Sequence, residues 1–113
     1  MATTALTAAD FSSTIEGNDV VLVDFWADWC GPCQRFAPIY EQASGRHDDV
    51  VFGKVDTEDA RDLAAALEIQ SIPTIMAFRD GQLVFRQAGL LNGKQLDSLI
   101  EQIKALDMEG LRK

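Results

Sequence analysis

The sequence predicts a single α/β domain with a mixed central β-sheet flanked by helices on both faces. An apolar run at 20–27, a helix-like stretch at 34–44 and a second apolar run at 50–55 together indicate a βαβ unit, whose two strands are parallel. Two further strand-like segments, 74–79 and 83–88, are joined at Asp80-Gly81, where a tight turn makes them antiparallel. A chain of 113 residues fits one domain with its own core.

The N-terminal third contributes a helix and the first strand. Thr7 can cap a helix in which Asp10 holds the third position, and Leu6 and Phe11 have the spacing of a hydrophobic staple. The run Val20 to Ala27 is apolar at nearly every position, which is typical of a strand covered by helices on both faces. We therefore expect this strand at the centre of the sheet.

The rest of the chain supplies the other elements. Apolar residues recur at helical spacing at Ala60, Leu63, Ala64 and Leu67. The last helix is expected to start at Asn92, with Gln95 completing a capping box. We expect one domain over residues 1–113, with its core at about 5–106 and a frayed tail at 107–113.

Charge and hydropathy exclude some classes of partner. The net charge is −8, and the ten basic residues are scattered, which argues against a nucleic-acid partner. No apolar run approaches the roughly 18 residues of a membrane helix. The N-terminus has no basic segment followed by an apolar one, so no secretory signal is expected and a cytoplasmic location is the default.

The two cysteines of the chain lie three positions apart in Trp29-Cys30-Gly31-Pro32-Cys33, between the first strand and the next helix. Unpaired N–H groups and the positive end of the dipole at the helix start would stabilise a thiolate at Cys30 and lower its pKa. Cys33 lies one turn further in. We expect Cys30 to be the exposed attacking nucleophile and Cys33 to be the shielded resolving thiol.

Three other interpretations of the cysteine pair are weaker. A structural disulfide closing so short a ring would remove little chain entropy. A zinc site needs about four ligands, and His47 is the one further soft donor, so such a site would require two chains. Two unrelated thiols are the remaining alternative. We expect no metal, and we expect His47 to be a solvated loop residue.

Asp24 interrupts the first strand on the same face as Leu22 and Trp26. An unpaired buried carboxylate costs several kcal/mol or takes up a proton, and desolvation raises its pKa toward a range that suits proton relay. A structural carboxylate, satisfied by hydrogen bonds or by Lys54, is an equally good interpretation. Lys54 is itself a cation within a strand expected to be buried, which favours pairing of the two.

The Ile72-Pro73-Thr74 segment is the third candidate feature. Proline at the start of a strand cannot donate to the ladder, and an X-Pro bond is where a cis peptide is least costly. The residues alone allow either a cis bond or an ordinary turn proline and favour the latter.

Together these segments resemble the thioredoxin family. The matching segments occur in the family's order over most of the chain: Val23 to Cys33, Pro38, Lys54-Val55-Asp56, Ser71 to Thr74, Asp80-Gly81 and Gly89. The resemblance implies the thioredoxin fold, with Cys30 as nucleophile, Cys33 as resolving thiol and Asp24 as the buried proton acceptor that helps Cys33 to ionise.

The resemblance also implies how a target binds. It implies that Pro73 is cis and faces the cysteines, and that the backbone of Ile72 pairs with an extended target segment. A flat apolar docking surface would be formed by Trp29, Gly31, Pro32, Ile72 and Gly89. For Trp29, packing in the core is the alternative.

The implied activity is that of a thiol–disulfide oxidoreductase acting as a reductant, because Gly31-Pro32 resembles the reducing members of the family. Its disulfide would be reduced by an NADPH-dependent flavoprotein reductase, so NADPH and FAD would belong to that partner and this chain, expected to be a monomer, would bind no cofactor. Gln34 departs from the family, since many members have a basic residue there, although Arg35 follows. A non-enzymatic binding module and a metal site shared by two chains are the rival hypotheses.

Overall fold

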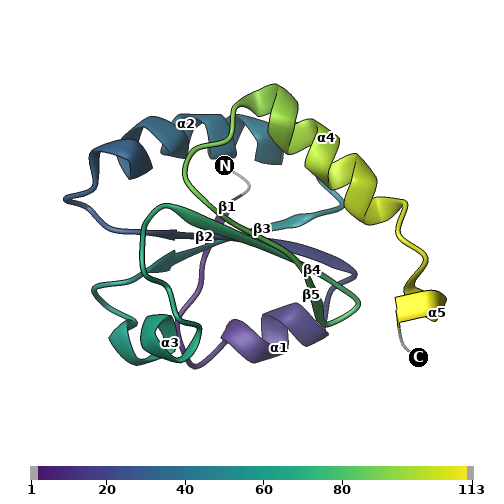
Figure 1. Ribbon diagram of the computed structural model, residues 1–113, viewed down its shortest axis with the longest axis horizontal. Coiled ribbons are helices and arrows are strands. Elements are labelled where there is room, and N and C mark those ends of the chain that lie inside the picture. The colour runs from purple at the N-terminus through teal and green to yellow at the C-terminus, as the bar shows by residue number, and fades with distance from the viewer. Residues whose placement is uncertain (1–2, 112–113) are drawn as a thin grey trace.

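The computed structural model describes residues 3–111 and extends 40 × 29 × 23 Å (Figure 1). The strands are β1 (Thr3–Ala5), β2 (Val20–Trp26), β3 (Val51–Asp56), β4 (Thr74–Arg79) and β5 (Gln82–Ala88). The helices are α1 (Phe11–Glu16), α2 (Gly31–Arg46), α3 (Arg61–Ala66), α4 (Gly93–Lys104) and α5 (Met108–Leu111).

The five strands form one mixed sheet in the order β1-β3-β2-β4-β5. β3 pairs in parallel with both β1 and β2, whereas β4 is antiparallel to β2 and to β5. Helices α2 and α4 lie on one face of the sheet and α1 and α3 on the other (Figure 1). The predicted mixed sheet with helices on both faces is confirmed, and so is the central place of β2.

Side chains alternate along β2 between two apolar cores, because successive residues of a strand point to opposite faces. Between the sheet and helices α2 and α4 lie Leu22, Phe36, Tyr40, Phe52, Ile75, Leu96 and Ile100. Between the sheet and helices α1 and α3 lie Phe11, Ile15, Val21, Val23, Phe25, Val55, Met76 and Phe78. Asp24 shares the first of these faces with Leu22, so its carboxylate points toward α2.

Two features of the N-terminal segment differ from the sequence prediction. The sequence does not predict β1, because three residues, Thr3–Ala5, carry no hydrophobic periodicity, and it is the pairing with β3 that orders them. Helix α1 begins at Phe11, later than predicted, and Thr7 does not cap it. Instead, the Thr7 backbone N–H donates to the Asp10 carboxylate over 2.6 Å, which completes a turn ahead of the helix.

The C-terminal segment is also more ordered than predicted. Met108 begins the short helix α5, and its side chain is buried. The predicted fraying of 107–113 therefore does not describe Met108, and Arg112 and Lys113 lie outside the described residues.

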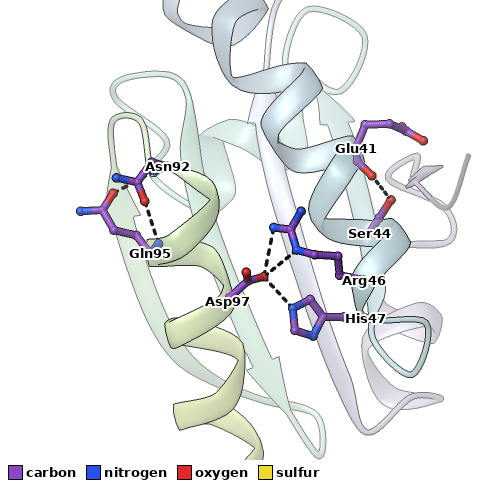
Figure 2. A network of polar contacts seen from close by, with 7 residues as sticks. All are labelled: Glu41, Ser44, Arg46, His47, Asn92, Gln95 and Asp97. Atoms are coloured by element: carbon purple, nitrogen blue, oxygen red, sulfur yellow. Dashed lines mark hydrogen bonds and ion pairs between the residues drawn. The ribbon is translucent and has the colours of Figure 1, made fainter.

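The predicted capping box of α4 is present (Figure 2). The Asn92 side chain accepts from the Gln95 backbone N–H over 2.8 Å, and the Gln95 side chain accepts from the Asn92 backbone N–H over 2.9 Å. Two otherwise unpaired N–H groups of the first turn are thereby satisfied, so the sequence alone locates the start of this helix.

A polar cluster ties the end of α2 to α4 (Figure 2). Asp97 lies 2.8 Å from His47 Nε2, and Arg46 donates to the same carboxylate over 3.1 Å. Hydrogen bonds from His47 and then Arg46 hold the pKa of Asp97 below its ordinary value. The expectation of a solvated His47 is wrong, since its side chain is 11% exposed and stacks on Phe52. This cluster fixes the far end of the helix that begins at the cysteines.

Candidate functional site

Cys30 and Cys33 form a disulfide where β2 leads into α2. Cys30 is the N-cap of α2, and its sulfur accepts the Cys33 backbone N–H over 3.2 Å. Their Cα atoms are 5.2 Å apart, within the range of an ordinary disulfide. A thiolate at Cys30 would therefore receive both a backbone hydrogen bond and the favourable field of the helix start.

Exposure does not distinguish the two cysteines, contrary to the expectation of an exposed Cys30. The exposed fraction is 4% for Cys30 and 3% for Cys33, because Ala27, Trp26 and Ile72 pack around the disulfide. Cys30 Sγ lies 3.6 Å from the Ile72 carbonyl oxygen, which comes from the loop before β4. The two cysteines differ in their position along the helix, since Cys30 caps it and Cys33 lies within its first turn.

The Ile72–Pro73 peptide bond is cis, as the family resemblance implied. The Pro73 carbonyl accepts the Gly89 N–H over 2.8 Å, and the Thr74 hydroxyl donates to the Ser71 carbonyl over 2.6 Å. Gly89 has φ +100°, a conformation that favours glycine. These bonds bring the ends of β4 and β5 together beside the disulfide.

Two exposed apolar side chains belong to segments that adjoin the disulfide or the cis-proline loop. Trp29 is 70% exposed, which excludes the core-packing alternative, and Leu90, next to Gly89, is 41% exposed. The Trp29 indole N–H donates to the Glu58 carboxylate over 3.4 Å, and Arg61 donates to the other oxygen of Glu58 over 2.8 Å. The sequence analysis missed Glu58 and Leu90. The sequence does not show which side chains are exposed, so it could not single out Leu90. No local sequence pattern marks Glu58 as a neighbour of Trp29.

Asp24 is 1% exposed, and its two carboxylate oxygens lack a hydrogen-bond partner among the described residues. Burial raises its pKa from 3.8 to about 7, and the nearby charge of Lys54 opposes that rise. A carboxyl group with this pKa changes protonation near neutral pH.

Lys54 lies opposite Asp24 in the pairing of β2 with β3. The predicted direct ion pair is not formed among the described residues. Instead, the Lys54 ammonium lies 5.0 Å from the centre of the Trp26 ring, in a cation–π arrangement. Lys54 therefore acts on Asp24 through its field and leaves the carboxylate oxygens unpaired.

A cavity of about 130 Å³ joins the acid to the disulfide. Asp24, Lys54 and Cys33 line it, and Gln34 stands at its exposed side. The space is large enough for a few water molecules. Asp24 and Cys33 therefore line the same small cavity.

The described part of the chain meets the requirements of neither a metal site nor a membrane-spanning helix. Among residues 3–111, no three His, Cys, Asp or Glu side chains are grouped in a way that could hold a metal ion. No helix in the described part of the chain is long and apolar enough to cross a membrane.

Replacing Trp29 with Ala is expected to reduce kcat/KM toward protein disulfides about tenfold, because an exposed indole beside the sulfurs is the kind of aromatic anchor that dominates binding. The melting temperature should change little, since the side chain contributes little to the core. Leu83→Ala is the matched control, because Leu83 is 51% exposed but lies on β5 opposite Phe78, at the other end of the sheet. Equal losses in both variants would contradict a docking role for Trp29.

Comparison with known proteins gives one consistent result. The family model described as Thioredoxin matches residues 2–105. A putative thioredoxin 2 from Streptomyces coelicolor is 49% identical, covering 98% of this chain and 83% of that protein. Thioredoxin 1 from Plasmodium falciparum is 40% identical over 86% of this chain and 92% of its own length.

Solved structures agree with the sequence relatives. A mutant thioredoxin from Halobacterium salinarum has a TM-score of 0.85 and 34% identity, covering 92% of each chain. A chloroplastic thioredoxin z has a TM-score of 0.88 and 31% identity, covering 94% of this chain and 97% of that one. With a disulfide at the start of α2, a cis-proline loop against it and these relatives, the chain belongs to the thioredoxin family of thiol–disulfide oxidoreductases.

Proposed function

We propose that this protein reduces disulfides in other proteins, with Cys30 as the nucleophile and Cys33 as the resolving thiol. The observation that carries the proposal is the position of the pair. The Cys30 sulfur caps α2 and lies 3.6 Å from the Ile72 carbonyl, so an attacking thiolate is stabilised at the place where a target segment can lie.

The reaction has two exchange steps. The Cys30 thiolate attacks one sulfur of the target disulfide, forming a mixed disulfide and releasing the other target sulfur, which takes a proton. The Cys33 thiolate then attacks the Cys30 sulfur, breaking the bond to the target and forming Cys30–Cys33. Two electrons pass to the target, which leaves as a dithiol.

Asp24 supports the second step. Cys33 must lose its proton before it attacks, and the cavity shared with Asp24 offers a route for that proton. The raised pKa of Asp24, about 7, makes its carboxylate a suitable acceptor near neutral pH. Lys54 tunes this acid through its charge, and the unpaired oxygens of Asp24 remain available to receive the proton.

The target binds across the docking surface formed by Trp29, Gly31, Pro32, Ile72 and Gly89. The backbone of Ile72 and the cis Pro73 can accept an extended target segment in a short β-strand addition. The exposed indole of Trp29 would pack against that segment and exclude water from the exchanging sulfurs.

The protein's own disulfide must be reduced after each turnover. An NADPH-dependent flavoprotein, a thioredoxin reductase, would supply the electrons, so FAD and NADPH act on the partner and this chain carries electrons through its sulfurs alone. We assign the protein to the cytoplasm, as a monomer whose single domain spans residues 1–113.

An insulin-disulfide reduction assay coupled to candidate reductases tests the activity, its direction and the electron source together. NADPH oxidation that requires both this protein and insulin is the expected result. A variant in which both cysteines are replaced by serine should be inactive. If that variant still performed the function of the parent in the cell, a non-enzymatic binding function would replace this proposal.

A further inference from the structure

We propose that Gln34 is a positioning residue that keeps the two sulfurs close together after reduction and so speeds closure of the Cys30–Cys33 disulfide. The inference deepens the proposed exchange mechanism and rests on it. Gln34 would act through the loop that carries Cys30, without touching the target.

The contact that carries the inference spans the redox pair. The Gln34 side-chain amide donates to the Asp28 carbonyl oxygen over 2.6 Å. Asp28 lies two residues before Cys30, and Gln34 directly follows Cys33. The side-chain hydrogen bond therefore bridges the chain from one side of the cysteine pair to the other.

Gln34 also binds the same loop through its backbone. Its N–H donates to the Cys30 carbonyl over 3.1 Å, as the first hydrogen bond of α2. The Cys30 N–H in turn donates to the Ala27 carbonyl over 3.2 Å. The backbone bonds hold Cys30 at the helix start, and the side-chain bond extends that hold to the turn before it, which also carries Trp29.

The importance of this link depends on the redox state. In the disulfide form, the covalent bond fixes the distance between the sulfurs. In the dithiol form and in the mixed disulfide with a target, that bond is absent, and non-covalent contacts must keep the loop against the helix. Holding two reacting groups in place raises their effective concentration, so the Gln34 link should favour attack of Cys33 on Cys30.

The chemical nature of Gln34 fits this role. A neutral amide can donate to a carbonyl without bringing a further charge to the cavity shared by Asp24 and Cys33. A lysine or arginine at this position would instead add a cation at the mouth of that cavity. In this chain an uncharged side chain therefore holds the loop, and Lys54 remains the residue whose charge acts on the pKa of Asp24.

The test replaces Gln34 with Met, which has a similar length but no hydrogen-bond donor. The fully reduced protein is mixed with Ellman's reagent, an aromatic disulfide whose thiolate product is coloured. A first colour phase reports attack by Cys30, and a second reports attack of Cys33 on the mixed disulfide. We expect the first phase to be unchanged and the second to slow about threefold, which corresponds to loss of one modest hydrogen bond.

The dithiol–disulfide equilibrium gives a second readout. Measured against glutathione, the equilibrium of the Gln34→Met variant should move about threefold toward the dithiol, a rise in reduction potential of about 14 mV. Gln42→Met is the matched control, because Gln42 is exposed on the same helix and distant from the cysteines in sequence. It should leave both phases and the equilibrium unchanged.

The outcomes separate this inference from the mechanism on which it rests. An unchanged second phase and equilibrium in Gln34→Met would overturn the positioning role while leaving the exchange mechanism intact. Equal slowing of both phases, or the same effect in Gln42→Met, would also overturn it. If the second phase of the parent survived replacement of Cys33 with serine, the assignment of Cys33 as the resolving thiol would be wrong.

Discussion

Cys33→Ser is expected to abolish turnover with insulin and to accumulate a covalent adduct between Cys30 and the target. Without the resolving thiol, the first exchange proceeds but the mixed disulfide cannot be released by the protein itself, so turnover should fall by roughly a thousandfold or more. Mass spectrometry after incubation with a disulfide target, with and without added reductant, measures the adduct. Cys30→Ser should lose turnover and form no stable adduct.

The reason to expect this asymmetry is the helix terminus. Both cysteines are nearly equally buried, so accessibility in the disulfide form predicts no difference between them. Cys30, however, caps α2 and accepts the Cys33 N–H, and this contact stabilises its thiolate and not that of Cys33. An adduct that formed on Cys33 in the Cys30→Ser variant, at a rate similar to that in Cys33→Ser, would contradict the assigned roles.

The sequence predicts those parts of the fold and site that depend on local signals. The buried strand β2 is recognisable because apolar residues occupy both of its faces, and α4 because Asn92 and Gln95 form a capping box. The cysteines are recognisable as a redox pair because their spacing brings both sulfurs to one helix start. A lone carboxylate inside an apolar strand likewise marks Asp24 as buried.

Other features depend on contacts between distant segments and have no local signal. β1 is ordered by its partner β3, and His47 is hydrogen-bonded to Asp97, 50 residues away. The burial of Cys30 comes from the loop of Ile72. The side chain of Lys54 turns to the ring of Trp26, which sequence neighbours could not indicate. These residues come into contact only in the folded protein.

The buried carboxyl of Asp24 is expected to make the oxidised protein less stable as the pH rises from about 4 to about 7. Its pKa is about 7 in the folded state and close to 3.8 when unfolded, so the folded state binds the proton more tightly. Stability from this group is full below the unfolded value and is lost as the pH rises through the folded value. A difference of about three pKa units corresponds to about 4 kcal/mol in the free energy of unfolding.

Asp24→Asn isolates this contribution. Urea unfolding of the parent and the variant between pH 4 and pH 8 should give similar stabilities at pH 4 and a variant several kcal/mol more stable at pH 8. The comparison cancels other groups, such as Asp97 and Asp49, whose lowered pKa values act in the opposite direction at lower pH. Glu16→Gln, at an exposed position of α1, is the control, and its free energy of unfolding should change with pH as that of the parent does.

At the pH values at which the Asp24→Asn variant is more stable than the parent, its resolving step should be slower. Its side-chain amide cannot take the proton of Cys33, so the second phase of the Ellman reaction should slow about tenfold or more near neutral pH, within the range of general base catalysis. In the parent, that phase should accelerate as the pH rises through about 7, the pKa of Asp24. Parallel loss of both phases would point to damaged geometry. Greater stability with an unchanged second phase would mean that the acid is merely buried and moves no proton.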